Sequence, residues 1–121
     1  MKRILIVDGE ERLAFLLKQS LKGLGDECEI LTTPGGQEAL ERVRAQPFDL
    51  IITDYRLKDM NGLQLTSAVK AMTPKTPIIL MTAYDSEELE AQAKSLKVYS
   101  YLAKPFPIEE IIRLTRQALE I

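Results

Sequence analysis

The stretch Asp49-Leu50-Ile51-Ile52-Thr53-Asp54 decides the fold of this chain. Its three consecutive aliphatic residues indicate a strand buried on both faces, which is typical of a parallel sheet covered by helices. The strand ends at the carboxylate of Asp54, and the polar segment 55–62 follows it. In an open α/β sheet, ligands bind outside the carboxyl ends of the strands. We therefore expect Asp54 to face a binding site.

Four further segments have the length and composition of strands, and a helical pattern follows each of the five. They are residues 4–7, 27–32, 78–82 and 99–103. The two more polar segments, 27–32 and 99–103, suit the edges of a sheet. Right-handed crossovers then predict an α/β fold with a doubly wound, five-stranded parallel sheet. Numbered along the chain, the strands are expected in the flavodoxin-like order 2-1-3-4-5, in one domain over residues 1–121.

Apolar residues three or four positions apart predict which helix faces are buried. The first helix is expected to reach about Leu24, and the third begins at Asn61, which forms a capping box with Gln64. Asp85 is the predicted cap of the fourth helix. The expected buried positions are Leu13, Leu16, Leu17, Leu21 and Leu24 in the first helix, Leu65, Ala68, Val69 and Met72 in the third, and Ile108, Ile111, Ile112, Thr115 and Leu119 in the fifth. Leu114 lies off the stripe of the fifth helix and is expected to be exposed.

The composition excludes several classes of function. The chain has no histidine, which removes Ser-His-Asp and Cys-His catalysis and His-ligated zinc. A net charge of -2 gives no sign of a nucleic-acid-binding or membrane-binding surface. The single cysteine, Cys28, excludes an internal disulfide and fits a cytoplasmic protein. The apolar run that follows Met1-Lys2-Arg3, from Ile4 to Val7, is too short for a signal peptide.

Polar side chains stand at the ends of four predicted strands. They are Asp8, Asp54, Thr82 and Lys104, and the carboxyl ends of parallel strands share one edge of a sheet. Two carboxylates close together need a cation, and Mg²⁺ prefers oxygen ligands. A carboxylate can also attack phosphorus and form an aspartyl phosphate, provided that a metal or lysine and a hydroxyl stabilise the charge. The pattern therefore indicates phosphoryl chemistry at Asp54.

At these residues the sequence resembles the receiver domains of bacterial two-component response regulators. The resemblance extends over the whole chain, and its motifs occur in the family's order and spacing. They are Ile4-Leu5-Ile6-Val7-Asp8, Asp49-Leu50-Ile51-Ile52-Thr53-Asp54, Met60-Asn61-Gly62, Thr82-Ala83 and Lys104-Pro105-Phe106.

The resemblance implies a role for each matching residue. Asp54 is then the phosphoacceptor, Lys104 contacts the phosphoryl group, and the Thr82 hydroxyl turns toward it. Ala83 leaves the site open to a donor, and the rotamer of Tyr101 follows Thr82 as a switch. The domain would be a regulatory phosphoacceptor, not an enzyme. Its expected partners are a histidine kinase or phosphotransfer protein and a downstream protein or fused output domain, reached through the fourth helix, fifth strand and fifth helix. A monomer or weak dimer is expected.

The same resemblance predicts a Mg²⁺ site with one departure. Its ligands would be Asp8, Asp54 and the backbone carbonyl of Arg56, with Glu10 as a further candidate. The family usually has a second acid directly after Asp8, and here that position is Gly9. The loss of a carboxylate is expected to weaken metal binding. In a rival hypothesis the Arg56 side chain fills the vacated charge site and no metal binds.

Three alternatives stay open at this point. The first is a pseudo-receiver, the same fold serving as a protein-interaction module with weakened or lost phosphorylation, as Gly9 suggests. The second is a small phosphatase of the haloacid dehalogenase type, but Glu10 is the wrong acid for its motif and Asp54 would have no role. The third is a flavodoxin-like flavin carrier, but acids at Asp8, Glu10 and Glu11 would repel the flavin phosphate.

Overall fold

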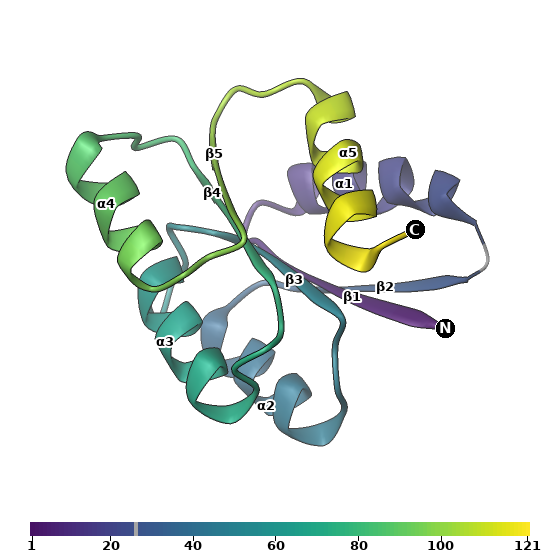
Figure 1. Ribbon diagram of the computed structural model, residues 1–121, viewed down its shortest axis with the longest axis horizontal. Coiled ribbons are helices and arrows are strands. Elements are labelled where there is room, and N and C mark those ends of the chain that lie inside the picture. Colours follow the sequence, from purple (N-terminus) through teal and green to yellow (C-terminus); the bar gives the residue numbers. More distant parts are fainter. Residues whose placement is uncertain (26) are drawn as a thin grey trace.

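Five parallel strands form one sheet in the order β2-β1-β3-β4-β5 in the computed structural model, which describes residues 1–25 and 27–121 (Figure 1). The strands are β1 (Lys2–Val7), β2 (Cys28–Thr33), β3 (Leu50–Asp54), β4 (Ile78–Thr82) and β5 (Ser100–Ala103). The helices are α1 (Glu11–Leu21), the 3₁₀ helix η1 (Lys22–Leu24), α2 (Gly36–Ala45), α3 (Gly62–Met72), α4 (Glu87–Ser95) and α5 (Ile108–Leu119). The predicted fold class and strand order are confirmed.

The helices cover both faces of the sheet, which explains the continuous apolar runs in its central strands. Ile4 and Ile6 of β1 pack in a cluster with residues of α1 and α5. Leu5 and Val7 point to the opposite face and pack with residues of α2 and α3. Successive side chains of a strand point to opposite faces, so a central strand here needs apolar residues at every position.

None of the helices in the described ranges is long and apolar enough to cross a membrane.

Three expectations about helix faces were wrong. Leu114 is buried, with 7% of its surface exposed, and it belongs to the same apolar cluster as Leu17 of α1. Because α5 lies against α1 as well as the sheet, its buried face is wider than one stripe. Leu16 is 51% exposed, since the buried residues of α1 are Ala14, Leu17 and Leu21, and Leu16 lies one step of about 100° away. Met72, the last residue of α3, is also exposed.

Of the two predicted helix caps, that of α3 is confirmed and that of α4 is wrong. Asn61 forms the predicted capping box with Gln64 at the start of α3. The cap of α4 is Ser86, whose side chain accepts a hydrogen bond from the N–H of Leu89, so the prediction of Asp85 was wrong. A serine directly before the first helical turn competes well for the capping position. Asp85 is thereby left to form a different contact, described below.

Candidate functional site

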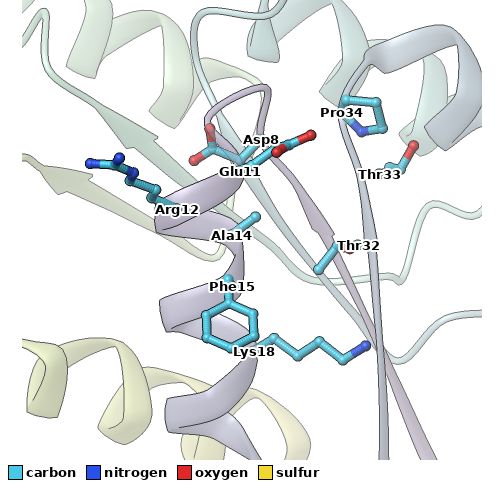
Figure 2. A pocket seen from close by; sticks show the side chains of 9 residues that line it. All are labelled: Asp8, Glu11, Arg12, Ala14, Phe15, Lys18, Thr32, Thr33 and Pro34. Atoms are coloured by element: carbon cyan, nitrogen blue, oxygen red, sulfur yellow. The ribbon is translucent and has the colours of Figure 1, made fainter.

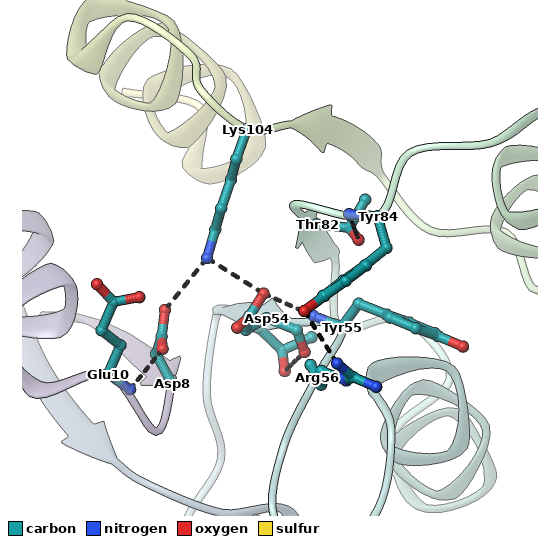
Figure 3. A network of polar contacts seen from close by, with 9 residues as sticks. Asp8, Glu10, Asp54, Tyr55, Arg56, Thr82, Tyr84 and Lys104 are labelled. Atoms are coloured by element: carbon teal, nitrogen blue, oxygen red, sulfur yellow. Dashed lines mark hydrogen bonds and ion pairs between the residues drawn. The ribbon is translucent and has the colours of Figure 1, made fainter.

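The carboxyl ends of β1, β3 and β5 bring Asp8, Asp54 and Lys104 together beside one open cleft (Figure 3). Asp54 is the last residue of β3, whereas Asp8 and Lys104 directly follow β1 and β5. The cleft has a volume of about 520 Å³, and its lining residues come from the loops after β1, β3, β4 and β5. They are Asp8, Gly9, Glu10, Asp54, Arg56, Leu57, Lys58, Ala83, Tyr84 and Lys104.

One lysine is shared between the two carboxylates. The Nζ atom of Lys104 lies 3.3 Å from Oδ1 of Asp54 and 3.9 Å from Oδ2 of Asp8. The side chain of Asp8 is fully buried, and those of Asp54 and Lys104 are 14% and 19% exposed. Charges in such a poorly hydrated place interact more strongly than at the surface. Two carboxylates and one ammonium leave a net negative charge, which favours a second cation or a cationic partner.

Asp8 has an acceptor atom that the described protein groups do not satisfy. Its Oδ1 accepts a hydrogen bond of 2.8 Å from the N–H of Glu10, but its buried Oδ2 has no hydrogen-bond partner among the described residues. Burial raises the pKa of Asp8 above its ordinary value, and the negative charge of Asp54 acts in the same direction. A buried carboxylate oxygen without a donor suits a hard cation such as Mg²⁺. The donor set therefore fits a divalent ion held by Asp8 and Asp54.

Glu10 and Gly9 limit this metal site. Figure 3 shows the Glu10 side chain on the side of Asp8 that is opposite to Asp54. Among the described residues, no group of three or more acidic, histidine or cysteine side chains could hold a metal ion. A Cβ atom added at Gly9 would lie 3.5 Å from the backbone oxygen of Pro34, an ordinary contact. The backbone at position 9 therefore accepts a Cβ atom without displacement.

The two oxygens of Asp54 have different surroundings. Oδ1 accepts a hydrogen bond of 3.0 Å from the N–H of Tyr55 and faces the ammonium of Lys104. No hydrogen bond to Oδ2 occurs within residues 1–25 and 27–121. One oxygen is thus held by two donors, while the other is available for chemistry.

The structure does not bring Thr82 onto Asp54. The Thr82 side chain is fully buried, and its Oγ1 accepts a hydrogen bond of 2.8 Å from the N–H of Tyr84. A hydroxyl that accepts one hydrogen bond still has a proton to donate. The oxygen of Thr82 is thus engaged by the Tyr84 N–H, while its hydroxyl proton remains available to an acceptor.

Arg56 and Tyr84 meet across the mouth of the cleft. The Arg56 guanidinium lies 4.6 Å from the centre of the Tyr84 ring, and its NH1 donates a hydrogen bond of 2.9 Å to the Tyr84 hydroxyl (Figure 3). Over the described part of the chain, Arg56 forms no ion pair with Asp8 or Asp54. The rival hypothesis, in which this side chain replaces the missing charge, therefore has no support in the geometry.

A family model described as the response regulator receiver domain matches residues 4–116. The chain belongs to this family. It is therefore the receiver domain of a two-component response regulator, as the strand-end motifs predicted.

Curated relatives of the receiver domain are longer regulators. It is 34% identical to the transcriptional regulatory protein ZraR of Escherichia coli K12 over 116 residues. This matched segment covers 96% of this chain and 26% of that protein. Over 114 residues it is 32% identical to the DNA-binding transcriptional regulator NtrC of the same organism, covering 94% of this chain and 24% of the relative. The chain thus spans about a quarter of the length of these relatives.

Solved receiver-like structures have the same fold over nearly the whole chain. Chemotaxis protein CheY4 of Vibrio cholerae has a TM-score of 0.89 at 28% identity, covering 98% of this chain and 99% of that one. A CheY-like receiver domain protein of Methanospirillum hungatei has the same TM-score and identity, covering 99% and 94%.

Tyr101 of the receiver domain lies away from the cleft. Its hydroxyl donates a hydrogen bond of 2.8 Å to Oδ1 of Asp85, in the loop between β4 and α4. Partial burial and this hydrogen bond raise the pKa of Tyr101 to about 12, so its hydroxyl keeps the proton that it donates. Two of these partners could not be found from the sequence. Asp85 binds Tyr101, which lies 16 positions away, and Tyr84 binds Arg56, which lies 28 positions away.

A second hollow of the receiver domain adjoins the cleft, between α1 and the end of β2 (Figure 2). Its volume is about 580 Å³, and Asp8 lines both hollows. Phe15 of α1 is 64% exposed here, between the basic residues Arg12 and Lys18. Phe15 is thus an exposed aromatic side chain beside two basic ones, in a hollow that shares Asp8 with the cleft.

Proposed function

We propose that this receiver domain accepts a phosphoryl group on Asp54 from a histidine kinase or phosphotransfer protein. The observation that carries the proposal is the surroundings of Asp54, whose Oδ1 is held by Lys104 and the N–H of Tyr55 at the floor of an open cleft. These two donors fix the carboxylate plane and leave Oδ2 facing an incoming donor. Such positioning supplies much of the rate in phosphoryl transfer.

The proposed step exchanges one bond to phosphorus for another. Oδ2 of Asp54 attacks the phosphorus of a phosphohistidine, an O–P bond forms, and the N–P bond breaks. The imidazole nitrogen leaves with the electron pair and takes up a proton from solvent, so the donor returns to neutral histidine. The Lys104 ammonium lies where negative charge gathers on the phosphoryl oxygens, and the Thr82 hydroxyl can donate to them after it rotates.

Asp8 and Asp54 are the residues that would hold Mg²⁺, with the Arg56 carbonyl as a third proposed ligand and Glu10 as a further candidate. When bound, the cation supplies positive charge to the transferring phosphoryl group. Because Gly9 contributes no carboxylate, we expect binding weaker than a three-acid site would give. The pseudo-receiver is the second candidate function, and Gly9 is the observation that favours it.

The signalling step is proposed to run through the loop between β4 and α4. Rotation of Thr82 toward a phosphoryl group removes the acceptor of the Tyr84 N–H. Asp85, the next residue, holds the hydroxyl of Tyr101 on β5. A shift of this loop would therefore release Tyr101 and change the face formed by α4, β5 and α5. A downstream protein or a fused output domain would read that face.

One experiment tests the proposal and separates its alternative. The protein, Asp54→Asn and Gly9→Asp are incubated with acetyl phosphate and Mg²⁺, and intact mass is followed. We expect one labile phosphoryl group on the native protein, none on Asp54→Asn, and half-maximal modification of Gly9→Asp at lower Mg²⁺. Modification that appears only in Gly9→Asp would establish the pseudo-receiver. An equal adduct in Asp54→Asn would contradict the assignment of Asp54.

The wall around Phe15 suggests where the phosphodonor protein binds. We propose that a kinase or phosphotransfer protein contacts Phe15, because this exposed aromatic lines a hollow that adjoins the cleft at Asp8. Phe15→Ala should slow transfer from a phosphorylated partner about tenfold, as loss of an aromatic anchor does. Its reaction with acetyl phosphate should stay unchanged, because that donor does not need the wall. Equal slowing with both donors would contradict this assignment.

A further inference from the structure

We propose that Asp59 is a positioning residue, which fixes the loop after Asp54 by binding the N-terminus of α2. The proposal rests on the proposed function in one respect, since it assigns Asp59 an effect on the reaction of Asp54. The contacts themselves stand independently of that reaction. We call the pairing of Asp59 with Gly36 and Gln37 the Asp59 clamp.

Both carboxylate oxygens of Asp59 are used in the clamp. Oδ1 accepts a hydrogen bond of 3.0 Å from the N–H of Gly36, and Oδ2 accepts one of 2.8 Å from the N–H of Gln37. These are among the backbone groups that a helix leaves unpaired at its start. The N-cap residue of α2 is Gly35, which has no side chain to bind them. A residue 22 to 23 positions away in the sequence thus caps the helix.

The electrostatics of the clamp are favourable. The N-terminus of a helix carries a partial positive charge, and a carboxylate there is stabilised. The two hydrogen bonds from Gln37 and Gly36 hold the pKa of Asp59 below its ordinary value. Asp59 is therefore ionised at neutral pH, and both hydrogen bonds are charge-assisted.

Two glycines form the surface that receives the loop. A Cβ atom at Gly35 would lie 3.3 Å from Oδ1 of Asp59, a tight contact. A Cβ atom at Gly36 would lie only 2.5 Å from both Cγ and Sδ of Met60. Residues 59 and 60 thus sit directly on the backbone of α2, where any side chain on Gly36 would push Met60 away.

The far end of the loop returns to Asp54. The N–H of Gly62 donates a hydrogen bond of 2.6 Å to the carbonyl of Tyr55, and Arg56 pairs with Asn61 in an antiparallel bridge. Residues 55–61 therefore form a closed loop, whose first residue supplies the N–H that holds Oδ1 of Asp54. Tyr55 itself is tied to β4, because its N–H also donates a hydrogen bond of 2.7 Å to the carbonyl of Met81. The anchor at Asp59 therefore restrains the part of the loop beyond Tyr55, which includes Arg56.

The clamp consequently sets the position of one wall of the cleft beside Asp54. Asp59 does not line the cleft, so it acts through Arg56, Leu57 and Lys58, which do. Without it, this wall would move relative to Asp54, and a phosphoryl donor in the cleft would lose part of its fixed position. Misplacement of a reacting group by a fraction of an ångström lowers the rate of reaction.

The test compares Asp59→Ala and Asp59→Asn with Ser86→Ala, which removes a different helix cap and serves as the stability control. Amide hydrogen exchange is measured without donor or metal. We expect faster exchange at Gly36, Gln37 and Gly62, whose N–H closes the loop, in Asp59→Ala, a smaller change in Asp59→Asn, and no change at these sites in Ser86→Ala. Asparagine keeps one acceptor oxygen, so it should rescue part of the effect.

The second readout is the rate of modification by acetyl phosphate as a function of donor concentration at saturating Mg²⁺. We expect about a fivefold to tenfold lower maximal rate in Asp59→Ala, with the donor concentration for half-maximal rate unchanged. Faster exchange at Gly36 and Gln37 with unchanged exchange at Gly62 would reduce Asp59 to a helix cap and overturn the proposal. Equal slowing by Ser86→Ala would do the same. If the native protein takes up no phosphoryl group, the proposed function fails, and the exchange data alone decide whether the clamp holds the loop.

Discussion

Two loops border Asp54, the proposed phosphoacceptor, and they are held in opposite ways. The loop of residues 55–61 is closed by two backbone contacts and attached to α2 by Asp59. The loop of residues 83–86 is exposed at every position, and its contacts are made by the side chains of Thr82, Tyr101 and Arg56. The first loop is therefore closed by contacts between backbone groups. The second depends on side chains that can rotate.

This difference separates the two tasks of the site. A loop that supplies donors to Asp54 must keep its geometry before and after the reaction, because a preorganised site does not reorganise during the step. A loop that reports the reaction must have two arrangements of similar free energy. We infer that residues 55–61 hold the site and that residues 83–86 respond to it. The following changes test this contrast, from the largest expected effect to the smallest.

The strongest perturbation of the fixed loop is Gly62→Ala. A Cβ atom there would lie 2.7 Å from the carbonyl oxygen of Asp54 and 3.0 Å from Cα of Tyr55, so backbone must move. We expect the free energy of unfolding to fall by about 3 kcal/mol, as overpacking of a buried position does. Urea denaturation measures this, and Gly23→Ala, where an added Cβ meets nothing within 4 Å, is the matched control. Equal effects of the two substitutions would contradict the close contact at Gly62.

The two loops also differ in the caps that follow them. The double variant Asn61→Ala with Gln64→Ala removes both hydrogen bonds of the capping box, and we expect it to lower the free energy of unfolding by about 1–2 kcal/mol. Ser86→Ala removes one hydrogen bond, with an expected loss of about 0.5–1 kcal/mol. Thermal or urea unfolding of the pair gives the comparison. A larger loss at Ser86 would mean that the second loop is the better-held one.

The contact of the responsive loop with β5 is tested by the titration of Tyr101. Its pKa of about 12 should fall by about one unit in Asp85→Asn, because the charged acceptor is removed. The raised pKa stabilises the fold fully below the ordinary tyrosine value, and this contribution disappears as pH rises through about 12. Tyrosinate absorbance, with Tyr101→Phe to isolate this residue from the other three tyrosines, measures the shift. An unchanged pKa would show that Asp85 does not hold the hydroxyl.

The smallest effect is expected where the two loops touch. Arg56 and Tyr84 join them through one hydrogen bond and one cation–π contact at the surface. A double-mutant cycle of Arg56→Ala and Tyr84→Ala should give a coupling of about 0.5–1 kcal/mol in the free energy of unfolding. A coupling of zero would show that the loops are independent in the unmodified protein.

Strand-level features of this receiver domain could be predicted from sequence, because each depends on local pattern. The side chains of a run such as Leu50-Ile51-Ile52 point to both faces of the sheet, so they are all buried only where helices cover both faces. The order of the strands then follows from crossover rules and edge polarity. The meeting of Asp8, Asp54 and Lys104 follows in turn, because parallel strands end on the same side.

The missed features depend on partners that are distant in the sequence. Leu114 is buried because α5 also contacts α1, and no periodicity within α5 contains that information. The bonds of Asp59 to α2 and of Asp85 to Tyr101 join segments through loop geometry. The sequence offered one weak signal, the Gly35-Gly36 pair at the start of a helix, where a capping side chain is expected and absent. Such a gap indicates that a cap comes from elsewhere in the fold.

The most direct test of the contrast follows individual amides when the phosphoryl group is added. Amide NMR spectra of the native protein are recorded with Mg²⁺, before and after saturation with acetyl phosphate, and Asp54→Asn is the control. We predict large shifts and faster hydrogen exchange at Tyr84, whose N–H loses Thr82 Oγ1 as its acceptor, and altered signals at Tyr101. Gly36 and Gln37, held by Asp59, should keep their slow exchange. Faster exchange at Gly36 and Gln37 with Tyr84 unchanged would contradict the account.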